Sequence, residues 1–154
     1  MPKGPRVVIP PPLIFVATYL AGLAINTVAP LRIGRFDGGP VTMVAPAIVG
    51  IGTLLVLAGV LSLAVARTAI IPHHEVRTVV TTGIYRHTRN PIYLGFLVAY
   101  LGTALWRGDV WPLLTLPFGL GLLKHYVIDL EEAHLQRKFG RPYEEYQRRV
   151  RRWI

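Results

Sequence analysis

The stretch TVVTTGIYRHTRNPIYLGF, residues Thr78–Phe96, is a polar junction between long apolar segments. It carries two tyrosines, a histidine, an asparagine and two arginines, and it runs directly into another apolar segment. Its Asn90-Pro91 pair predicts the start of a helix, because proline fits the first turn and asparagine is a preferred residue just before it. The apolar segments on either side determine what kind of fold presents this junction.

Four apolar segments predict an all-α, multi-pass transmembrane bundle. A helix needs about 20 apolar residues to cross a hydrocarbon core of about 30 Å. The expected spans are residues 13–29, 41–66, 92–105 and 111–127. We expect the last two to form a tight pair joined by Trp106–Asp109. The alternative for that pair is a re-entrant hairpin, which is tolerated only where protein or a cavity covers its backbone. The first segment is too long for a signal peptide, so we expect it to be retained.

The basic residues predict the orientation of this bundle. The chain has 154 residues, 52% of them hydrophobic, and a net charge of +9. With both termini inside, fourteen of the 17 Lys and Arg residues face the cytoplasm and three face outward, as the positive-inside rule expects. The outward three are Arg32, Arg35 and Arg107. The charge therefore indicates contact with the lipid bilayer and its anionic headgroups, and not with nucleic acid.

Two polar segments, the loop 67–91 and the tail 129–154, fall on the predicted cytoplasmic side of this single domain. Tyr143, Tyr146, Val150 and Trp153 repeat every three or four residues among arginines. We expect an amphipathic helix in the headgroup region, with its arginines solvated and facing lipid. Glu131 and Glu132 lie about 100° apart on a helix. At most one therefore faces a given pocket, and the other offsets nearby arginines.

Several simpler interpretations and exclusions constrain the chemistry. Asn90-Pro91 has a purely structural reading as a helix start, and Tyr85 and Tyr93 have one as interfacial anchors. The chain has no cysteine, which excludes disulfides, thiolate nucleophiles and cysteine-bound metals. His73-His74-Glu75 is a poor metal site, because adjacent histidines do not easily bind one tetrahedral ion and no further ligand has the usual spacing. We therefore expect no metal.

Four linked motifs in the second half of the chain resemble the isoprenylcysteine carboxyl methyltransferase family and its phospholipid methyltransferase relatives. They are TTGIY from Thr81, RNPIYLG from Arg89, EEAHL from Glu131 and FGRPYEEY from Phe139. The first two spans match only in being hydrophobic. The resemblance implies a small integral membrane enzyme that uses S-adenosylmethionine (SAM) and methylates a lipophilic or lipidated acceptor on the cytoplasmic side.

The resemblance also implies the site residues. The loop and the tail are expected to cap a cofactor pocket whose residues are Arg77, Thr78, Val79, Val80, Tyr85, Asn90, Pro91, Ile92, Tyr93 and Glu131. Arg89, Tyr93 and Glu131 are the candidate catalytic residues. A carboxylate would suit the amino group of SAM, and backbone N–H groups or Arg89 would suit its carboxylate. Tyr85, Val79 and Val80 would form an apolar wall for the adenine.

Two positions depart from the family pattern. Asn90 replaces the usual histidine and cannot act as a base. Val127 stands where prenylcysteine-modifying members have an arginine for the substrate carboxylate. The resemblance therefore supports the cofactor better than that substrate, and a carboxylate or thiolate acceptor, which needs no general base, is favoured. The alternatives are a membrane reductase that binds NADPH and a non-catalytic membrane scaffold or transporter.

Overall fold

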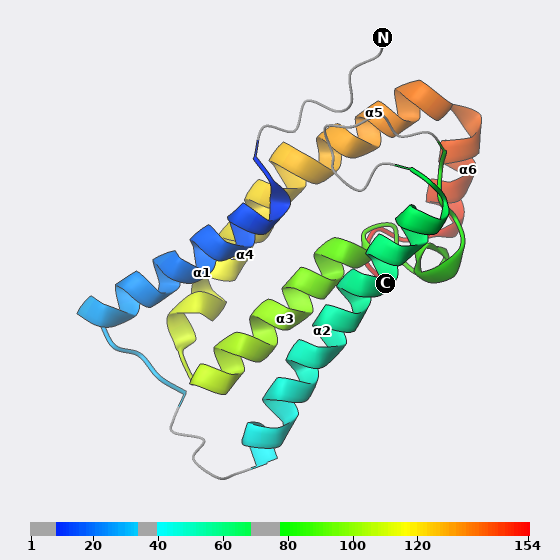
Figure 1. Ribbon diagram of the computed structural model, residues 1–154. Helices are drawn as coiled ribbons and strands as arrows, with labels where there is room; N and C mark the ends of the chain where they lie inside the picture. The colour runs from blue at the N-terminus through cyan, green and yellow to red at the C-terminus, as the bar shows by residue number, and fades with distance from the viewer. Residues whose placement is uncertain (1–8, 34–39, 69–77) are drawn as a thin grey trace.

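The computed structural model describes residues 9–33, 40–68 and 78–154, and their secondary structure is helical apart from one isolated antiparallel bridge between Arg32 and Asp109. Figure 1 shows the arrangement. The helices are α1 (Pro11–Val28), α2 (Pro40–Val65), α3 (Pro91–Arg107), α4 (Val110–Leu123), α5 (Asp129–Phe139) and α6 (Arg141–Arg149). A 3₁₀ turn, η1 (Gly83–Arg86), precedes α3, and a π-helical turn, η2 (Lys124–Ile128), joins α4 to α5. The all-α prediction is confirmed.

Within the described residues, three helices are long and apolar enough to cross a membrane. They are α1, residues Met43–Val65 of α2, and the continuous helix Val110–Phe139 formed by α4, η2 and α5. The last has 30 residues, which is about 45 Å at 1.5 Å per residue and exceeds the hydrocarbon core. Its polar α5 part therefore extends beyond the apolar stretch. Helix α3 has 17 residues, and a crossing by α3 stays a prediction.

The helices pack as two pairs, α2 with α3 and α1 with α4 (Figure 1). A Cβ atom on Gly52 would lie 2.7 Å from the carbonyl oxygen of Gly95, and one on Gly22 would lie 2.6 Å from the backbone nitrogen of Pro112. These glycines let backbones approach closely, as small residues do between membrane helices. The expected tight pairing of the third and fourth spans is wrong, because each packs chiefly on an earlier helix.

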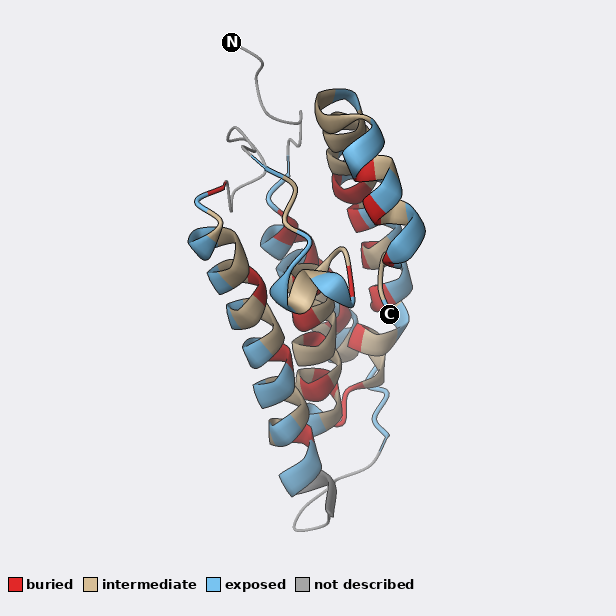
Figure 2. Ribbon diagram, turned by 90° about the vertical axis from the view of Figure 1, so that its right-hand side faces the viewer, coloured by how far each residue is buried: buried red, intermediate tan, exposed pale blue. Residues whose placement is uncertain are grey.

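An aromatic cluster joins the two pairs. Phe15 of α1 lies 5.7 Å from Phe96 and 6.4 Å from Tyr100 of α3, measured between ring centroids. Tyr19 meets Tyr100 edge to face at 4.9 Å. Figure 2 shows buried residues where helices meet and exposed ones along their outward faces. The outward face of α2 is apolar, with Ile51, Leu54, Leu57, Leu61 and Val65 all exposed. Such a surface is suited to lipid.

A buried carboxylate closes the end of the bundle opposite α5 and α6. Asp109 is 1% exposed and follows Gly108, whose left-handed backbone ends α3. It accepts hydrogen bonds from Asn26 Nδ2 at 3.1 Å and Arg107 Nε at 2.8 Å, and Arg32 Nε lies 3.8 Å away. The α3–α4 turn is thereby tied to the end of α1 and the residues that follow it.

The C-terminal helix packs against protein. Helix α5 ends at Phe139, the following Gly140 has a positive φ of 58°, and α6 turns back from there. Tyr143, Tyr146 and Val150 are buried against Val79 of the loop and against Leu135 and Phe139 of α5. The apolar face of α6 is therefore covered by the protein itself, which corrects the expectation that this face lies in the headgroup region.

Candidate functional site

The polar junction of the sequence folds into a tight corner between α2 and α3. Gly83 opens η1 with a φ of 60°, and a Cβ there would lie 2.9 Å from Ser62 Oγ of α2. Tyr85 lies in this turn, and Tyr146 Oη of α6 donates a hydrogen bond to its carbonyl oxygen at 2.8 Å. The loop and the tail are thus in direct contact, as the two polar segments predicted.

Glu131 points from α5 toward α3. Tyr93 Oη, in the first turn of α3, lies 2.8 Å and 3.0 Å from the two carboxylate oxygens of Glu131 and donates to them. Burial chiefly, with smaller contributions from Tyr146 and Glu131, raises the pKa of Tyr85 above its ordinary value. Tyr85, Tyr93 and Glu131 therefore form one partly buried group, drawn from the loop, α3 and α5. Its carboxylate has remaining lone pairs for a cationic ligand.

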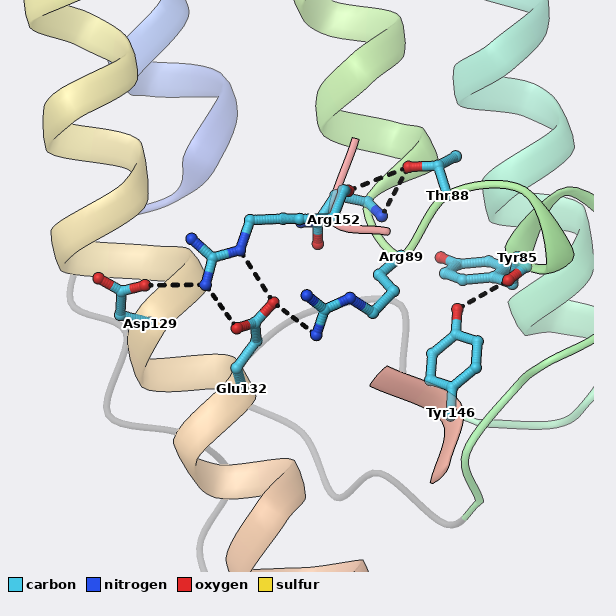
Figure 3. A network of polar contacts seen from close by, with 8 residues as sticks. Tyr85, Thr88, Arg89, Asp129, Glu132, Tyr146 and Arg152 are labelled. Carbon is cyan, nitrogen blue, oxygen red and sulfur yellow. Dashed lines mark hydrogen bonds and ion pairs between the residues drawn. The ribbon is translucent and has the colours of Figure 1, made fainter. Parts of the chain in front are cut away.

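Glu132 has a different set of partners (Figure 3). Arg152 donates to its two oxygens, from Nε at 3.1 Å and from Nη2 at 2.6 Å. Arg89 Nη1 lies 3.2 Å from Glu132 Oε1, and the two side chains are 13% and 16% exposed. The prediction that one glutamate offsets arginines is confirmed, and that glutamate is Glu132. The same contacts show that Arg152 belongs to an internal network, which corrects its assignment to a solvated, lipid-facing surface.

Arg89 and Asn90 form the corner between loop and helix. Asn90 occupies the position before α3, but its side chain makes no capping hydrogen bond. Its N–H donates to Thr88 Oγ1 at 3.2 Å instead. Asn90 Nδ2 and Arg89 Nε are buried and find no hydrogen-bond partner within residues 9–33, 40–68 and 78–154. Buried donors are normally satisfied, so both of these groups are available to donate to a ligand.

The other predicted cofactor residues divide into three groups. Val79 packs under the tyrosines of α6, Val80 is half-buried, and Thr78 is exposed. Pro91 and Ile92 pack on α2, where a Cβ on Gly59 would lie 2.6 Å from Ile92 Cγ1. Arg77 lies outside the described residues, as do His73, His74 and Glu75.

Sequence reasoning missed Thr88 and Arg152. Thr88 is 2% exposed, and its hydroxyl donates to the carbonyl oxygen of Arg152 at 3.1 Å. The N–H of Arg89 donates to the carbonyl oxygen of Arg151 at 3.0 Å. Hydrogen bonds to the backbone carbonyl groups of the tail do not depend on residue type, so the sequence does not reveal them. The only signal in the sequence was the surplus of arginines in the tail, which could pair with Glu132.

Val127 lies in the π-helical turn η2, where its side chain is buried. Both Val127 and Ile128 are fully buried in the aromatic core. A π turn accommodates an extra residue within a helix and often occurs beside functional sites. Val127 is thus a core residue of η2. The nearby Lys124 is exposed and pairs with Asp129 at 2.7 Å.

A groove of about 270 Å³ opens between α1 and α3. Its lining is mostly apolar and consists of Pro12, Phe15, Val16, Tyr19, Leu20, Phe96, Ala99, Tyr100 and Thr103. Tyr93, Phe96, Tyr100 and Thr103 follow one another at three or four residues and therefore share a face of α3. Phe96, the first residue of α3 in the groove, therefore lies about one helical turn, or about 5 Å, along the helix from Tyr93.

The fold and site define an all-helical protein with membrane-length apolar helices and a polar, partly buried site at one end. The phospholipid methyltransferase family model matches residues 41–142, well over half of the chain, and the chain belongs to this family. The matched region runs from α2 to the start of α6 and so includes both glutamates and the Arg89–Tyr93 corner.

Curated relatives agree with this family. The chain is 42% identical over 73 residues to protein-S-isoprenylcysteine O-methyltransferase of Schizosaccharomyces pombe, covering 46% of this chain and 30% of that protein. It is 38% identical over 82 residues to the probable protein-S-isoprenylcysteine O-methyltransferase of Oryza sativa subsp. indica, covering 52% and 42%. An uncharacterized protein of Haemophilus influenzae is 33% identical over 63 residues, 41% of this chain and all of that protein. The chain thus spans less than half the length of the two named methyltransferases. No solved structure matches it.

Proposed function

We propose that this chain is an integral membrane methyltransferase that binds SAM between the loop and the tail and methylates a lipophilic acceptor. The contact between Tyr93 and Glu131 carries the proposal, because it holds a partly buried carboxylate against the first turn of α3, the turn that follows Arg89 and Asn90, in a member of the phospholipid methyltransferase family. Membership of this family favours a methyltransferase over the NADPH-binding reductase and the scaffold or transporter.

The donor and acceptor groups at the corner fit the polar part of SAM. Glu131 would receive the ammonium group, and Asn90 Nδ2 with Arg89 Nε would donate to the carboxylate. Tyr85 and Val80, supported by Val79 on the tyrosines of α6, would cover the adenine. When bound, SAM supplies an electrophilic methyl group. Tyr93 would hold the Glu131 carboxylate in one orientation through its two contacts with the carboxylate oxygens.

The groove between α1 and α3 supports an acceptor with an apolar chain. Its apolar lining comes from α1, which is long and apolar enough to cross a membrane, and from α3, so a lipid chain would enter sideways and lie along the face that carries Tyr93. Proximity and alignment would then supply most of the rate enhancement. An acceptor that arrives as a carboxylate or thiolate needs no general base, which is consistent with Asn90 at the position of the family histidine. Arg89 and Tyr93 would contact the reacting molecules at the mouth of the groove.

The charge distribution supports a cytoplasmic orientation of the site. The tail carries the exposed arginines Arg148, Arg149 and Arg151, and it contacts the corner through the carbonyl oxygens of Arg151 and Arg152. With positive residues inside, this corner faces the cytoplasm. The bundle then crosses the bilayer four times, with α3 as the short span.

Calorimetric titration of SAM and S-adenosylhomocysteine into detergent-purified protein tests the proposal. We expect wild-type protein to bind both and Glu131→Gln to lose at least about tenfold in affinity, since charge-assisted hydrogen bonds contribute about 1.5–3 kcal/mol. Glu145→Gln, which removes the same charge from an exposed position on α6, serves as the matched control. NADPH is the comparison ligand. Binding of NADPH in place of both sulfur compounds would favour the reductase, and binding of none would refute the cofactor assignment.

A further inference from the structure

The last residues of the chain return to the corner that carries the orphan donors. After α6 ends, the carbonyl oxygen of Arg151 accepts the Arg89 N–H at 3.0 Å, and that of Arg152 accepts the Thr88 hydroxyl at 3.1 Å. Thr88 Oγ1 in turn accepts the Asn90 N–H at 3.2 Å. The backbone from Thr88 to Asn90 is thus held by the tail as well as by α3, whose Leu94 N–H donates to the Asn90 carbonyl oxygen at 2.9 Å.

The side chain of Arg152 connects the same tail to α5. Its guanidinium contacts both oxygens of Glu132 at 3.1 Å and 2.6 Å, and its Nη2 lies 3.4 Å from Asp129 Oδ1. A planar guanidinium facing a carboxylate in this way is among the stronger and more directional ion pairs. Glu132 Oε1 is shared with Arg89 Nη1 at 3.2 Å. Arg152, Glu132 and Arg89 therefore form one chain of alternating charge (Figure 3).

We propose that Arg152 is a positioning residue for the cofactor site, which fixes Arg89 and Asn90 through Glu132 and through the tail backbone. The proposal rests on the proposed function. Arg152 contacts neither Glu131 nor Tyr93 in the described structure, so its effect is indirect. Without its guanidinium, Glu132 would retain Arg89 as its remaining arginine partner. The Arg89 side chain would then be drawn toward Glu132, and the tail carbonyl groups would lose the ion pair that holds them in place.

Binding of S-adenosylhomocysteine to Arg152→Ala, Arg152→Lys and Arg148→Ala tests this role. Arg148 is an exposed arginine of the same tail and is the matched control. We expect Arg152→Ala to raise the Kd about tenfold or more and Arg148→Ala to bind as wild type. Arg152→Lys should restore part of the lost affinity, because lysine keeps the charge but lacks the forked donors of the guanidinium. A purely structural role would instead lower the number of binding sites per protein and leave the Kd of the folded fraction unchanged.

A double-mutant cycle with Glu132→Gln identifies the route. If Arg152 acts through Glu132, Arg152→Ala will raise the Kd much less in the Glu132→Gln background than in wild type. Hydrogen exchange of the Arg89 and Asn90 amides adds a readout that needs no ligand, and we expect faster exchange in Arg152→Ala. Wild-type binding with an unchanged Kd and unchanged exchange in Arg152→Ala would overturn this inference alone. Absence of binding by wild-type protein would overturn the proposed function, and this inference with it.

Discussion

Replacing Gly52 by alanine tests the close packing of α2 on α3. A Cβ atom at this position would lie 2.5 Å from the backbone nitrogen of Ala99 and 2.7 Å from the carbonyl oxygen of Gly95. Both are backbone atoms of α3, so the added methyl group is accommodated only if the helices separate. Overpacking of this kind costs about 1–3 kcal/mol, and alanine recovers about 0.5–1 kcal/mol of helix propensity. We expect a net loss of up to about 2.5 kcal/mol, which lowers the unfolding midpoint by up to about 10 °C for a chain of this size.

Gly50→Ala is the matched control for this substitution. It lies in the same helix, and a Cβ atom there meets nothing within 4 Å. The propensity gain is then unopposed, and we expect the unfolding midpoint to rise by about 1–4 °C. Thermal unfolding followed by tryptophan fluorescence in one detergent measures both variants. If Gly52→Ala raised the midpoint as much as Gly50→Ala does, the two backbones would not be in contact at this position.

Three further predictions address the core, the far end of the bundle and its orientation. Val127→Arg buries a charge in the aromatic core and should abolish a monodisperse preparation in size-exclusion chromatography, whereas Tyr126→Arg, at a 48% exposed position one residue away, should be tolerated. Equal tolerance of both would show that the core has room for the family arginine. Asp109→Ala removes the acceptor shared by Asn26 and Arg107 and should lower the free energy of unfolding by about 1–3 kcal/mol. The unfolding midpoint measures this loss, and an unchanged midpoint would contradict the role of this carboxylate. The chain has no cysteine, so a single cysteine at Arg148 or at Ile33 reports which side of the membrane that residue faces. A membrane-impermeant maleimide should label Ile33→Cys in intact cells and Arg148→Cys only after permeabilisation. The opposite labelling pattern would show the opposite orientation.

The helices themselves were predictable because their signal is local. The expected spans 13–29 and 41–66 correspond to Pro11–Val28 and Pro40–Val65, since long uncharged runs and flanking prolines define both. The pairing of the helices was not predictable in the same way. It depends on which glycines meet which backbones, and Gly52 and Gly95 are separated by more than forty residues. Nothing in their local sequence distinguishes a contact with each other from a contact with lipid.

The site shows a similar division. The geometry of adjacent helical residues predicted that Glu131 and Glu132 have different partners, and Glu132 does bind Arg89 and Arg152. Which arginine of the tail it binds could not be predicted, because four arginines follow one another between residues 148 and 152. The choice depends on where α6 ends, and the backbone at Val150 becomes extended there. The roles of Glu131, Tyr93 and Asn90 toward a cofactor stay predictions that the proposed titrations test.

The pairing of α1 with α4 has a consequence for biogenesis. The hydroxyl of Thr115 donates to the carbonyl oxygen of Thr18 across 97 residues of sequence, so the ribosome completes α2 and α3 before the partner of α1 exists. Helices α2 and α3 follow one another and can associate as soon as both have been synthesised. Helix α1 must wait beside them with the face around Gly22 uncovered until α4 arrives. A translocon or a chaperone that shields this face during synthesis would therefore act on the first helix for longer than on any other.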